Sequence, residues 1–290
     1  MGNLIRCITS DGFVSAVAIN STNIIYRAER IHRSSAVVTA ALGRLLTAAS
    51  LIGSSIKDEN GSVTLRIKGD GPVEALIAVS DSEGNVRGYP VNPIVEIPLN
   101  KNGKLDVGAC VGQGTLFISK DIGEKEPYNG TVELISGEIA EDITAYFAQS
   151  EQIPTVCALG VLVNPDLTVK AAGGYLIQLL PAAGEEEIKK IEKGINAIPS
   201  ITQMLTNGMD ILDIVKLALS EFEVEVLSES DVIYKCNCTR ERVKKALISI
   251  GKSDFQKIID EQGKTEVDCH FCEKRYKFNK LELEKLVSKI

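Results

Sequence analysis

The stretch YKCNC, Tyr234–Cys238, decides how the last part of this 290-residue chain folds. A related stretch, DCHFC, occupies Asp268–Cys272, so four of the seven cysteines lie in two close pairs. Zinc prefers four soft ligands in a tetrahedron, and two local pairs joined by a compact fold supply them. The sequence therefore predicts one Zn²⁺ held by Cys236, Cys238, Cys269 and Cys272.

Two other roles for these cysteines remain open at this point. Cys269 and Cys272 have common zinc-knuckle spacing, but Cys236 and Cys238 are closer together than in the usual pattern. The four could be structural thiols without a metal. A redox-active CxxC needs a βαβ context, whereas the residues around Cys269 indicate a hairpin. His270 is an alternative ligand, although we expect it to point outward because four cysteines are available.

A site closed by four thiolates leaves no open position on the metal, so it predicts a staple without Lewis-acid chemistry. Residues 231–290 have a thin core, and a unit of about 60 residues is marginal by itself. Structural zinc contributes on the order of 10–16 kcal/mol, so we expect this segment to unfold without it.

The same cysteines allow a redox switch, because oxidants attack the thiolate form. Cys238 is expected at a helix N-terminus, which favours the thiolate. Nearby basic residues are expected to act in the same direction, namely Lys235, Arg240, Arg242, Lys274 and Arg275. An oxidant that paired neighbouring sulfurs would release the metal and unfold the segment.

The sequence divides into three segments. Residues 231–290 predict a small domain with a helix capped by Thr239, a second helix from Ser253, a hairpin that carries Cys269 and Cys272, and a last helix. Residues 182–230 predict short helices whose apolar load must pack on another part of the protein. We expect them to cover an apolar face of the first domain, residues 1–181.

Residues 1–181 predict an α+β domain with a largely antiparallel β core and packed helices. The predicted strands are 13–19, 62–69, 73–80, 85–90, 115–121, 131–136, 156–163 and 175–180. Helices are predicted over Ser34–Ile56 and from about Glu138 to Gln149. The first is long and apolar, but Arg44 near its middle predicts a buried core helix rather than a membrane span.

Composition and charge narrow the class of protein. Hydrophobic residues make up 44% and charged residues 24% of the chain, as in globular proteins. The N-terminus carries no secretory signal, so we expect a cytoplasmic protein with no membrane partner. The net charge of −7 argues against a nucleic-acid binder. Residues 231–290, in contrast, carry 14 Lys and Arg against 10 Asp and Glu, which favours contact with something acidic.

No convincing catalytic constellation is present, so we predict that the protein is not an enzyme. His32 is predicted to be solvated before a helix, and Glu141 and Asp142 to lie on an exposed helix face. The glycine-rich stretches 69–72 and 112–114 lack the dinucleotide pattern and predict turns.

The other cysteines, Cys7, Cys110 and Cys157, are scattered through the first segment. An odd total and this spacing argue against a disulfide framework. We predict that all three are small buried hydrophobes.

Several longer stretches point to one family. They are IKGDGPVEALIAVSDSEGNVRGYP (Ile67–Pro90), YFAQSEQIPT (Tyr146–Thr155), GGYLIQLLP (Gly173–Pro181), CNCTRERVKKAL from Cys236, and DCHFCEKRYKF from Asp268. With these, the chain resembles over nearly its full length the 33 kDa chaperonin (heat shock protein 33) family, which are bacterial redox-regulated holdases that act without ATP.

The resemblance implies a mechanism for the four cysteines. Cys236, Cys238, Cys269 and Cys272 would bind one Zn²⁺ in the reduced, inactive form. Oxidation would form Cys236–Cys238 and Cys269–Cys272 disulfides, release zinc and unfold the segment before the tail. The active form would be a homodimer that binds unfolding client proteins. Two alternatives remain, a zinc-stapled adaptor that binds nucleic acid or protein through 231–290 and an enzyme that acts through the glycine-rich stretches.

Overall fold

The computed structural model describes residues 1–249 and 264–287. The fold class is α+β, as predicted. The chain forms two compact units, Met1–Lys235 (unit 1) and Cys236–Ile290 (unit 2), which are described separately below. The division at residues 181 and 230 that we predicted from the sequence stays a prediction.

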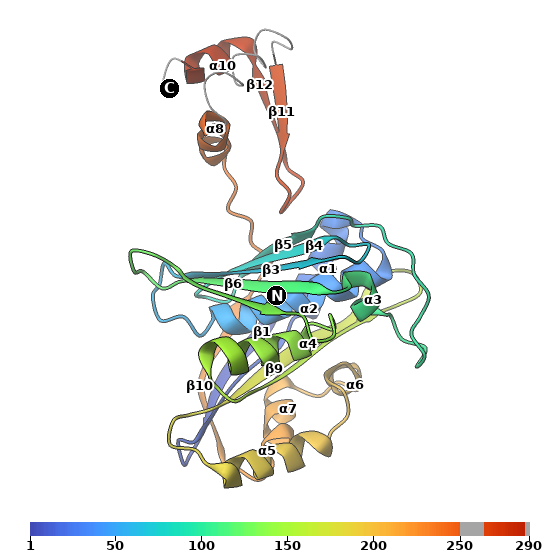
Figure 1. Cartoon of the computed structure of the whole chain (residues 1–290), viewed down its shortest axis with the longest axis vertical. Helices are drawn as coiled ribbons and strands as arrows, with labels where there is room; N and C mark the ends of the chain where they lie inside the picture. The colour runs from blue at the N-terminus through green and yellow to red at the C-terminus, as the bar shows by residue number, and fades with distance from the viewer. Residues whose placement is uncertain (250–263, 288–290) are drawn as a thin grey trace. The chain divides into compact units, whose positions relative to one another are not determined.

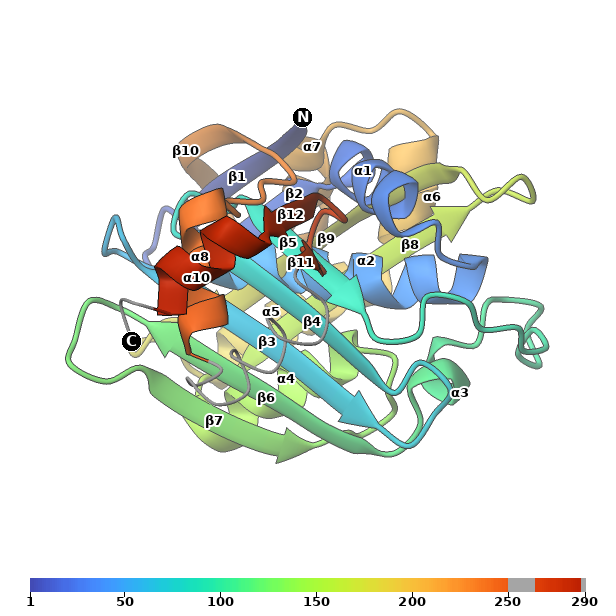
Figure 2. The same ribbon diagram turned by 90° about the horizontal axis from the view of Figure 1, so that it is seen from above.

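Unit 1 contains two five-stranded antiparallel sheets. Sheet A has the strand order β10-β1-β2-β9-β8, and sheet B, whose strands lie side by side in Figure 2, has the order β5-β4-β3-β6-β7. The strands of sheet A are β1 (Gly2–Thr9), β2 (Val14–Asn20), β8 (Thr155–Val163), β9 (Val169–Leu179) and β10 (Val224–Val232). Those of sheet B are β3 (Ser62–Gly69), β4 (Ala75–Asp81), β5 (Val86–Pro90), β6 (Gly114–Asp121) and β7 (Tyr128–Glu133).

The eight predicted strands are all present, with shifted ends. Two strands and two helices were not predicted, namely β1, β10, α1 (Thr22–His32) and α3 (Val107–Val111). The prediction of helix up to residue 230 was wrong for β10, where Val224 and Val226 alternate with acidic residues and the backbone pairs with β1.

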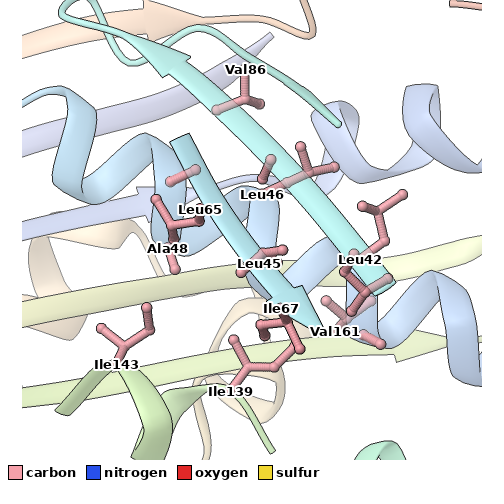
Figure 3. Packing of buried hydrophobic residues seen from close by; sticks show 14 of the residues in the cluster. Leu42, Leu45, Leu46, Ala48, Leu65, Ile67, Val86, Ile139, Ile143 and Val161 are labelled. Carbon is pink, nitrogen blue, oxygen red and sulfur yellow. The ribbon is translucent and has the colours of Figure 1, made fainter. Parts of the chain in front are cut away.

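Helix α2 (Ala36–Gly53) confirms the predicted buried core helix. It contacts strands of both sheets. Its Leu45 belongs to the same buried hydrophobic cluster as Leu65 and Ile67 of β3 (Figure 3). Within the described residues it is the one helix long and apolar enough to span a membrane, but 89% of that span is buried inside the protein. Arg44 pairs with Glu138, so its charge is neutralised locally.

The predicted helix over 138–149 corresponds to α4 (Ala140–Tyr146) and the π-helical turn η1 (Phe147–Glu151). The prediction that Asp142 is exposed was wrong, because its side chain is fully buried. Its carboxylate accepts hydrogen bonds from the backbone N–H groups of the preceding turn, Ile135 at 2.7 Å, Ser136 at 3.1 Å and Ile139 at 2.8 Å. Asp142 thereby holds Ile139, whose φ of 74° is rare for a branched residue. Glu141 is exposed, as predicted.

The prediction for His32 was also wrong. His32 is the last residue of α1 and is buried, with Nε2 2.9 Å from the carbonyl oxygen of Gly88 in β5. A short helix that precedes α2 was not apparent from the sequence, so this histidine was placed outside a helix.

Three short helices cover the face of sheet A that is turned away from α2 (Figure 1). They are α5 (Glu185–Asn196), α6 (Ile201–Thr206) and α7 (Ile211–Ala218). The breaks predicted at Pro199 and Gly208 lie between these helices, whereas the break predicted at Gly194 was wrong, because Gly194 lies within α5. Ile191, Met204 and Ile214 pack in one cluster with Ile5 of β1 and Ile177 of β9. A further helix, α3 (Val107–Val111), lies between sheet B strands in the sequence.

Unit 2 is small. Helix α8 (Arg240–Ile248) is followed after the gap by β11 (Lys264–Asp268), β12 (Arg275–Asn279) and α10 (Lys280–Val287). This confirms the first helix, the hairpin and the last helix of the prediction, while the helix predicted from Ser253 falls outside the described residues. Among the described residues of unit 2, the buried core consists of Val243, Leu247, Tyr276, Phe278, Leu283 and Leu286.

Candidate metal centre

Cys236 and Cys238 lie on the extended segment that leads into α8. The helix begins where Thr239 Oγ1 accepts a hydrogen bond from the backbone N–H of Arg242 at 3.2 Å. Thr239 is thus the N-cap, as predicted, and Cys238 directly precedes it. This position at the positive end of a helix favours a thiolate.

Cys269 and Cys272 lie on the turn between β11 and β12. The backbone N–H of Cys269 donates to Lys274 O at 3.0 Å, and Cys269 O accepts from the N–H groups of Cys272 at 3.2 Å and Glu273 at 2.7 Å. Glu273 has φ 56°, which closes the turn tightly. The turn therefore projects both sulfurs from one compact loop.

The structure brings the four sulfurs together. All four Sγ atoms lie within 4.8 Å of one another, with Cys236 Sγ 3.7 Å from Cys269 Sγ and Cys238 Sγ 3.4 Å from Cys272 Sγ. Zinc–sulfur bonds of about 2.3 Å in a tetrahedron place neighbouring sulfurs about 3.8 Å apart. The donor set thus fits one tetrahedral thiophilic ion, with each pair of cysteines contributing two ligands.

The thiols of Cys236, Cys238 and Cys272 ionise unequally. Burial alone would raise the pKa of Cys238, but hydrogen bonds from Tyr276 and from the other three cysteines outweigh it and lower the pKa to about 7. Burial raises the pKa of Cys236 and, together with hydrogen bonds among the thiols, that of Cys272. Cys238 therefore becomes a thiolate before Cys236 and Cys272, and an entering cation must displace the protons of those two.

Tyr276 was not identified from the sequence as part of the site. It is a buried residue of β12 whose hydroxyl donates to Cys238 Sγ at 3.2 Å. A tyrosine four residues after a CxxC pair carries no sequence signal that it reaches the other pair, because that contact depends on how the hairpin meets α8.

The basic residues expected to favour thiolates have other partners. Arg275 forms two hydrogen bonds with Asp268, at 2.8 and 3.0 Å. Arg240 contacts Glu282 at 2.7 Å, and Lys235, in unit 1, lies 3.4 Å from Glu83. The main groups that lower the pKa of Cys238 are instead Tyr276 and the neighbouring thiols.

The remaining cysteines lie apart from this cluster in unit 1. Cys7 and Cys110 are buried, as predicted, and burial raises the pKa of both, to about 11 for Cys110. Cys157 in β8 is only partly buried. Among the described residues, the group that could hold a metal ion contains the four cysteines and does not include His270.

The fold and the site together define a class of protein, an α+β protein whose small second unit is built around four thiols that leave a bound metal no open position. A sequence model described as Hsp33 protein matches residues 2–279. The chain belongs to the Hsp33 family, which are chaperones and not enzymes.

Individual relatives agree over the full length. The 33 kDa chaperonin of Lachnoclostridium phytofermentans is 46% identical over 286 residues, which cover 99% of this chain and 98% of the relative. That of Clostridioides difficile is 46% identical, with 99% of each chain covered. The crystal structure of the 33 kDa chaperonin of Thermotoga maritima superposes with a TM-score of 0.91 at 38% identity, and covers 99% of this chain and 98% of that one.

Proposed function

We propose that this protein is a redox-regulated, ATP-independent holdase that protects unfolding proteins in the cytoplasm. In the reduced state Cys236, Cys238, Cys269 and Cys272 hold one Zn²⁺, and the protein is inactive. The observation that carries the proposal is the grouping of four sulfurs within 4.8 Å in a chain of a chaperone family.

Zinc is the best match among metals, because an all-thiolate tetrahedral set suits it and structural zinc sites are closed in this way. When bound, the metal supplies cross-linking between the CxC segment and the hairpin turn and keeps all four sulfurs as thiolates. Unit 2 depends on this cross-link, since its own core is small.

Oxidation by a peroxide is the activating step. Two molecules of hydrogen peroxide accept four electrons from four thiolates, and with four protons give two disulfides and four waters. We assign the bonds to Cys236–Cys238 and Cys269–Cys272, the pairing that the resemblance to the Hsp33 family implies. Disulfide sulfurs are no longer thiolates, so zinc leaves and unit 2 loses its cross-link.

The consequence proposed for the rest of the chain is exposure of apolar surface. The segment 182–230 covers Ile5, Tyr175 and Ile177 of sheet A with its helices α5 to α7. Its unfolding would uncover these residues for client proteins, and the oxidised form acts as a homodimer. We propose no nucleic-acid or membrane partner.

Light scattering of a thermally unfolding client tests the proposal. The zinc-loaded reduced protein should leave aggregation unchanged, and the same protein treated with peroxide at elevated temperature should suppress it. Equal suppression by both states would make the metal a staple on a constitutive chaperone. Suppression by neither state, with salt-sensitive RNA binding by the reduced protein, would favour an adaptor instead.

Cysteine variants locate the switch. A variant with Cys269→Ser and Cys272→Ser should bind no zinc and should lose the difference between the reduced and peroxide-treated states. Cys157→Ser is the matched control, because Cys157 is also partly buried but lies in unit 1. A Cys157→Ser protein that lost the redox response would contradict the assignment.

A further inference from the structure

β10, the strand that ends unit 1, is weakly held for a strand at the edge of a sheet. Every residue from Glu225 to Asp231 is exposed, including Val226 at 45% and Leu227 at 60%. The register with β1 jumps between Arg6 and Cys7, which leaves Leu227 as a bulge. Its acidic and serine residues are types that strands disfavour, namely Glu225, Ser228, Glu229, Ser230 and Asp231.

The neighbouring strand β1, in contrast to β10, buries most of its apolar side chains. Leu4, Ile5 and Cys7 are each at most 2% exposed. Leu4 packs in the cluster around α2, whereas Ile5 and Cys7 pack in the cluster beneath α5 to α7. β1 therefore presents apolar side chains to both faces of sheet A, and β10 is the element that occupies its outer edge.

The contact between β10 and β1 is also loosely filled. A surface hollow of about 610 Å³ is lined by Leu4 and Arg6 of β1, Ser228 and Ser230 of β10 and further residues of unit 1. Beyond the backbone ladder, the side-chain bond between the two strands is from Asn3 Nδ2 to Glu229 at 2.7 Å, and it is exposed. Between its two ends, side-chain packing thus contributes little to holding β10, whereas Val232 at its C-terminal end is fully buried in the cluster around α2.

What fixes β10 is its C-terminal end, where residues Ile233–Lys235 form what we term the latch. Val86 N–H donates to Ile233 O at 3.0 Å, and Lys235 N–H donates to Val86 O at 2.8 Å. The Tyr234 hydroxyl donates to Gly88 O at 2.7 Å and lies 3.3 Å from His32 Nε2. The latch therefore ties the end of β10 to β5 of the other sheet.

The latch ends at the first thiol of the metal centre. Lys235, which lies 3.4 Å from Glu83 and 3.6 Å from Asp81, is followed directly by Cys236. One peptide bond joins Lys235 to Cys236. We therefore expect a change in backbone conformation at Cys236 to disturb the hydrogen bonds of the latch.

We infer that loss of the metal centre releases the latch and β10, and that β1 then pairs with an extended segment of an unfolding protein. The client segment would replace β10 as the edge strand of sheet A. This inference rests on the proposed redox function and names the surface that the oxidised form uses. Addition of a strand to an open sheet edge is a known way to bind extended chains, with main-chain hydrogen bonds supplying sequence-tolerant affinity.

The structure also defines which segments fit. Side chains of the added strand alternate between the α2 side of sheet A and the side that α5 to α7 cover in the reduced form. On both sides β1 offers apolar neighbours, Leu4 on the first and Ile5 and Cys7 on the second. The departing strand carries Glu225, Glu229 and Asp231, whereas β1 carries Arg6 as its charged residue. Segments with many branched apolar residues and no proline should therefore bind best, with an acidic residue favoured only next to Arg6.

Hydrogen exchange of the full-length protein tests the release. On oxidation, the β1 amides that face β10 should lose protection, while the amides of β2, which is paired on both sides, should keep theirs. If β1 stays protected in oxidised protein that suppresses client aggregation, the inference fails and the proposed function stands. Absence of any suppression by the oxidised protein would overturn the function instead.

A peptide probe tests the replacement. The probe copies Phe222–Ile233 with Glu225→Thr and Glu229→Thr, carries a fluorophore, and is compared with the same peptide N-methylated at alternate residues. The unmethylated peptide should bind oxidised protein, restore protection of β1 and compete with a client, whereas the methylated peptide should not. Equal binding of both peptides, or binding that leaves β1 unprotected, would overturn strand addition.

Two tyrosine variants test the latch. Tyr234→Phe removes the hydroxyl that donates to Gly88 O and accepts from Gly88 N–H at 3.2 Å, and this loss should speed exchange of β10 in the reduced, zinc-loaded protein at least roughly two- to tenfold. Tyr26→Phe, at an exposed position of α1, is the matched control and should leave exchange unchanged. Unchanged β10 exchange in Tyr234→Phe would show that the latch does not hold the strand.

Discussion

The two units are stabilised by different means. In unit 1, α2 lies between two sheets and buries residues all around its surface, so the fold rests on apolar packing. In unit 2 the described core is limited to Val243, Leu247, Tyr276, Phe278, Leu283 and Leu286, and four thiols stand next to it. The difference teaches that one chain can combine a core held by apolar packing with a small unit whose folding depends on four thiols.

Removal of zinc should give the largest difference in stability between the two units. Because structural zinc contributes on the order of 10–16 kcal/mol, a strong chelator should unfold unit 2 of the reduced protein and leave the core around α2 folded. Limited proteolysis and hydrogen exchange of each unit would show this. Retention of protected β11 and β12 amides in metal-free protein would contradict it.

Truncation in the core of unit 1 should have the converse effect. Leu45 of α2 is fully buried, so Leu45→Ala should lower the free energy of unfolding of unit 1 by about 2–5 kcal/mol. Denaturant unfolding measures this, and competition with a chromophoric chelator should find the zinc affinity of unit 2 unchanged. A large loss of zinc affinity would mean that the two units do not behave independently.

Loss of the Tyr276 hydroxyl should weaken the metal centre without removing a ligand. Hydrogen-bond partners of metal ligands typically affect affinity 10–100-fold, so Tyr276→Phe should lower zinc affinity by roughly tenfold. The phenyl ring keeps the packing of the unit 2 core. The readout is chelator competition, with Tyr26→Phe of unit 1 as the control, and an unchanged affinity would show that this bond is incidental.

The smallest effect is expected at Asp268. Hydrogen bonds from Arg275 lower the pKa of Asp268. The stability that the Asp268–Arg275 pair contributes is therefore fully present above the ordinary carboxyl pKa of about 3.9, and it is lost as the pH falls through the lower pKa of the folded protein. Asp268→Asn should therefore reduce zinc affinity less than about fivefold. The ratio to the unsubstituted protein should stay constant between pH 6 and pH 8, and a ratio that varied in this range would contradict the pairing.

The sequence predicted those features that depend on residues close together in the chain. The apolar repeat of Ser34–Ile56, the alternating strands of sheet B and the Thr239 cap all appear in the structure. The four cysteines were located from their spacing alone, because metal-binding chemistry restricts which residues and spacings occur.

What the sequence did not reveal depends on contacts between distant residues. β10 pairs with β1, so a polar run near residue 228 becomes a strand only because an apolar strand from the start of the chain is adjacent. Asp142 is buried because a turn directs backbone N–H groups at it, and Tyr276 meets Cys238 only after the hairpin has formed. The partners of β10 and Tyr276 lie too far away in the sequence to be recognised. Those of Asp142 lie only three to seven residues away, but they become its partners only through the conformation of the turn.

The pairing of the first strand with the last strand of unit 1 also has a consequence for biosynthesis. β1 ends at Thr9, whereas β10 ends at Val232. At about 5–20 residues per second, a ribosome needs on the order of ten to forty seconds to reach the second strand after making the first. During that interval the edge of β1 that later pairs with β10 has no partner in the nascent chain. Several nascent chains on one messenger RNA are therefore at risk of pairing β1 with a strand of a neighbouring copy.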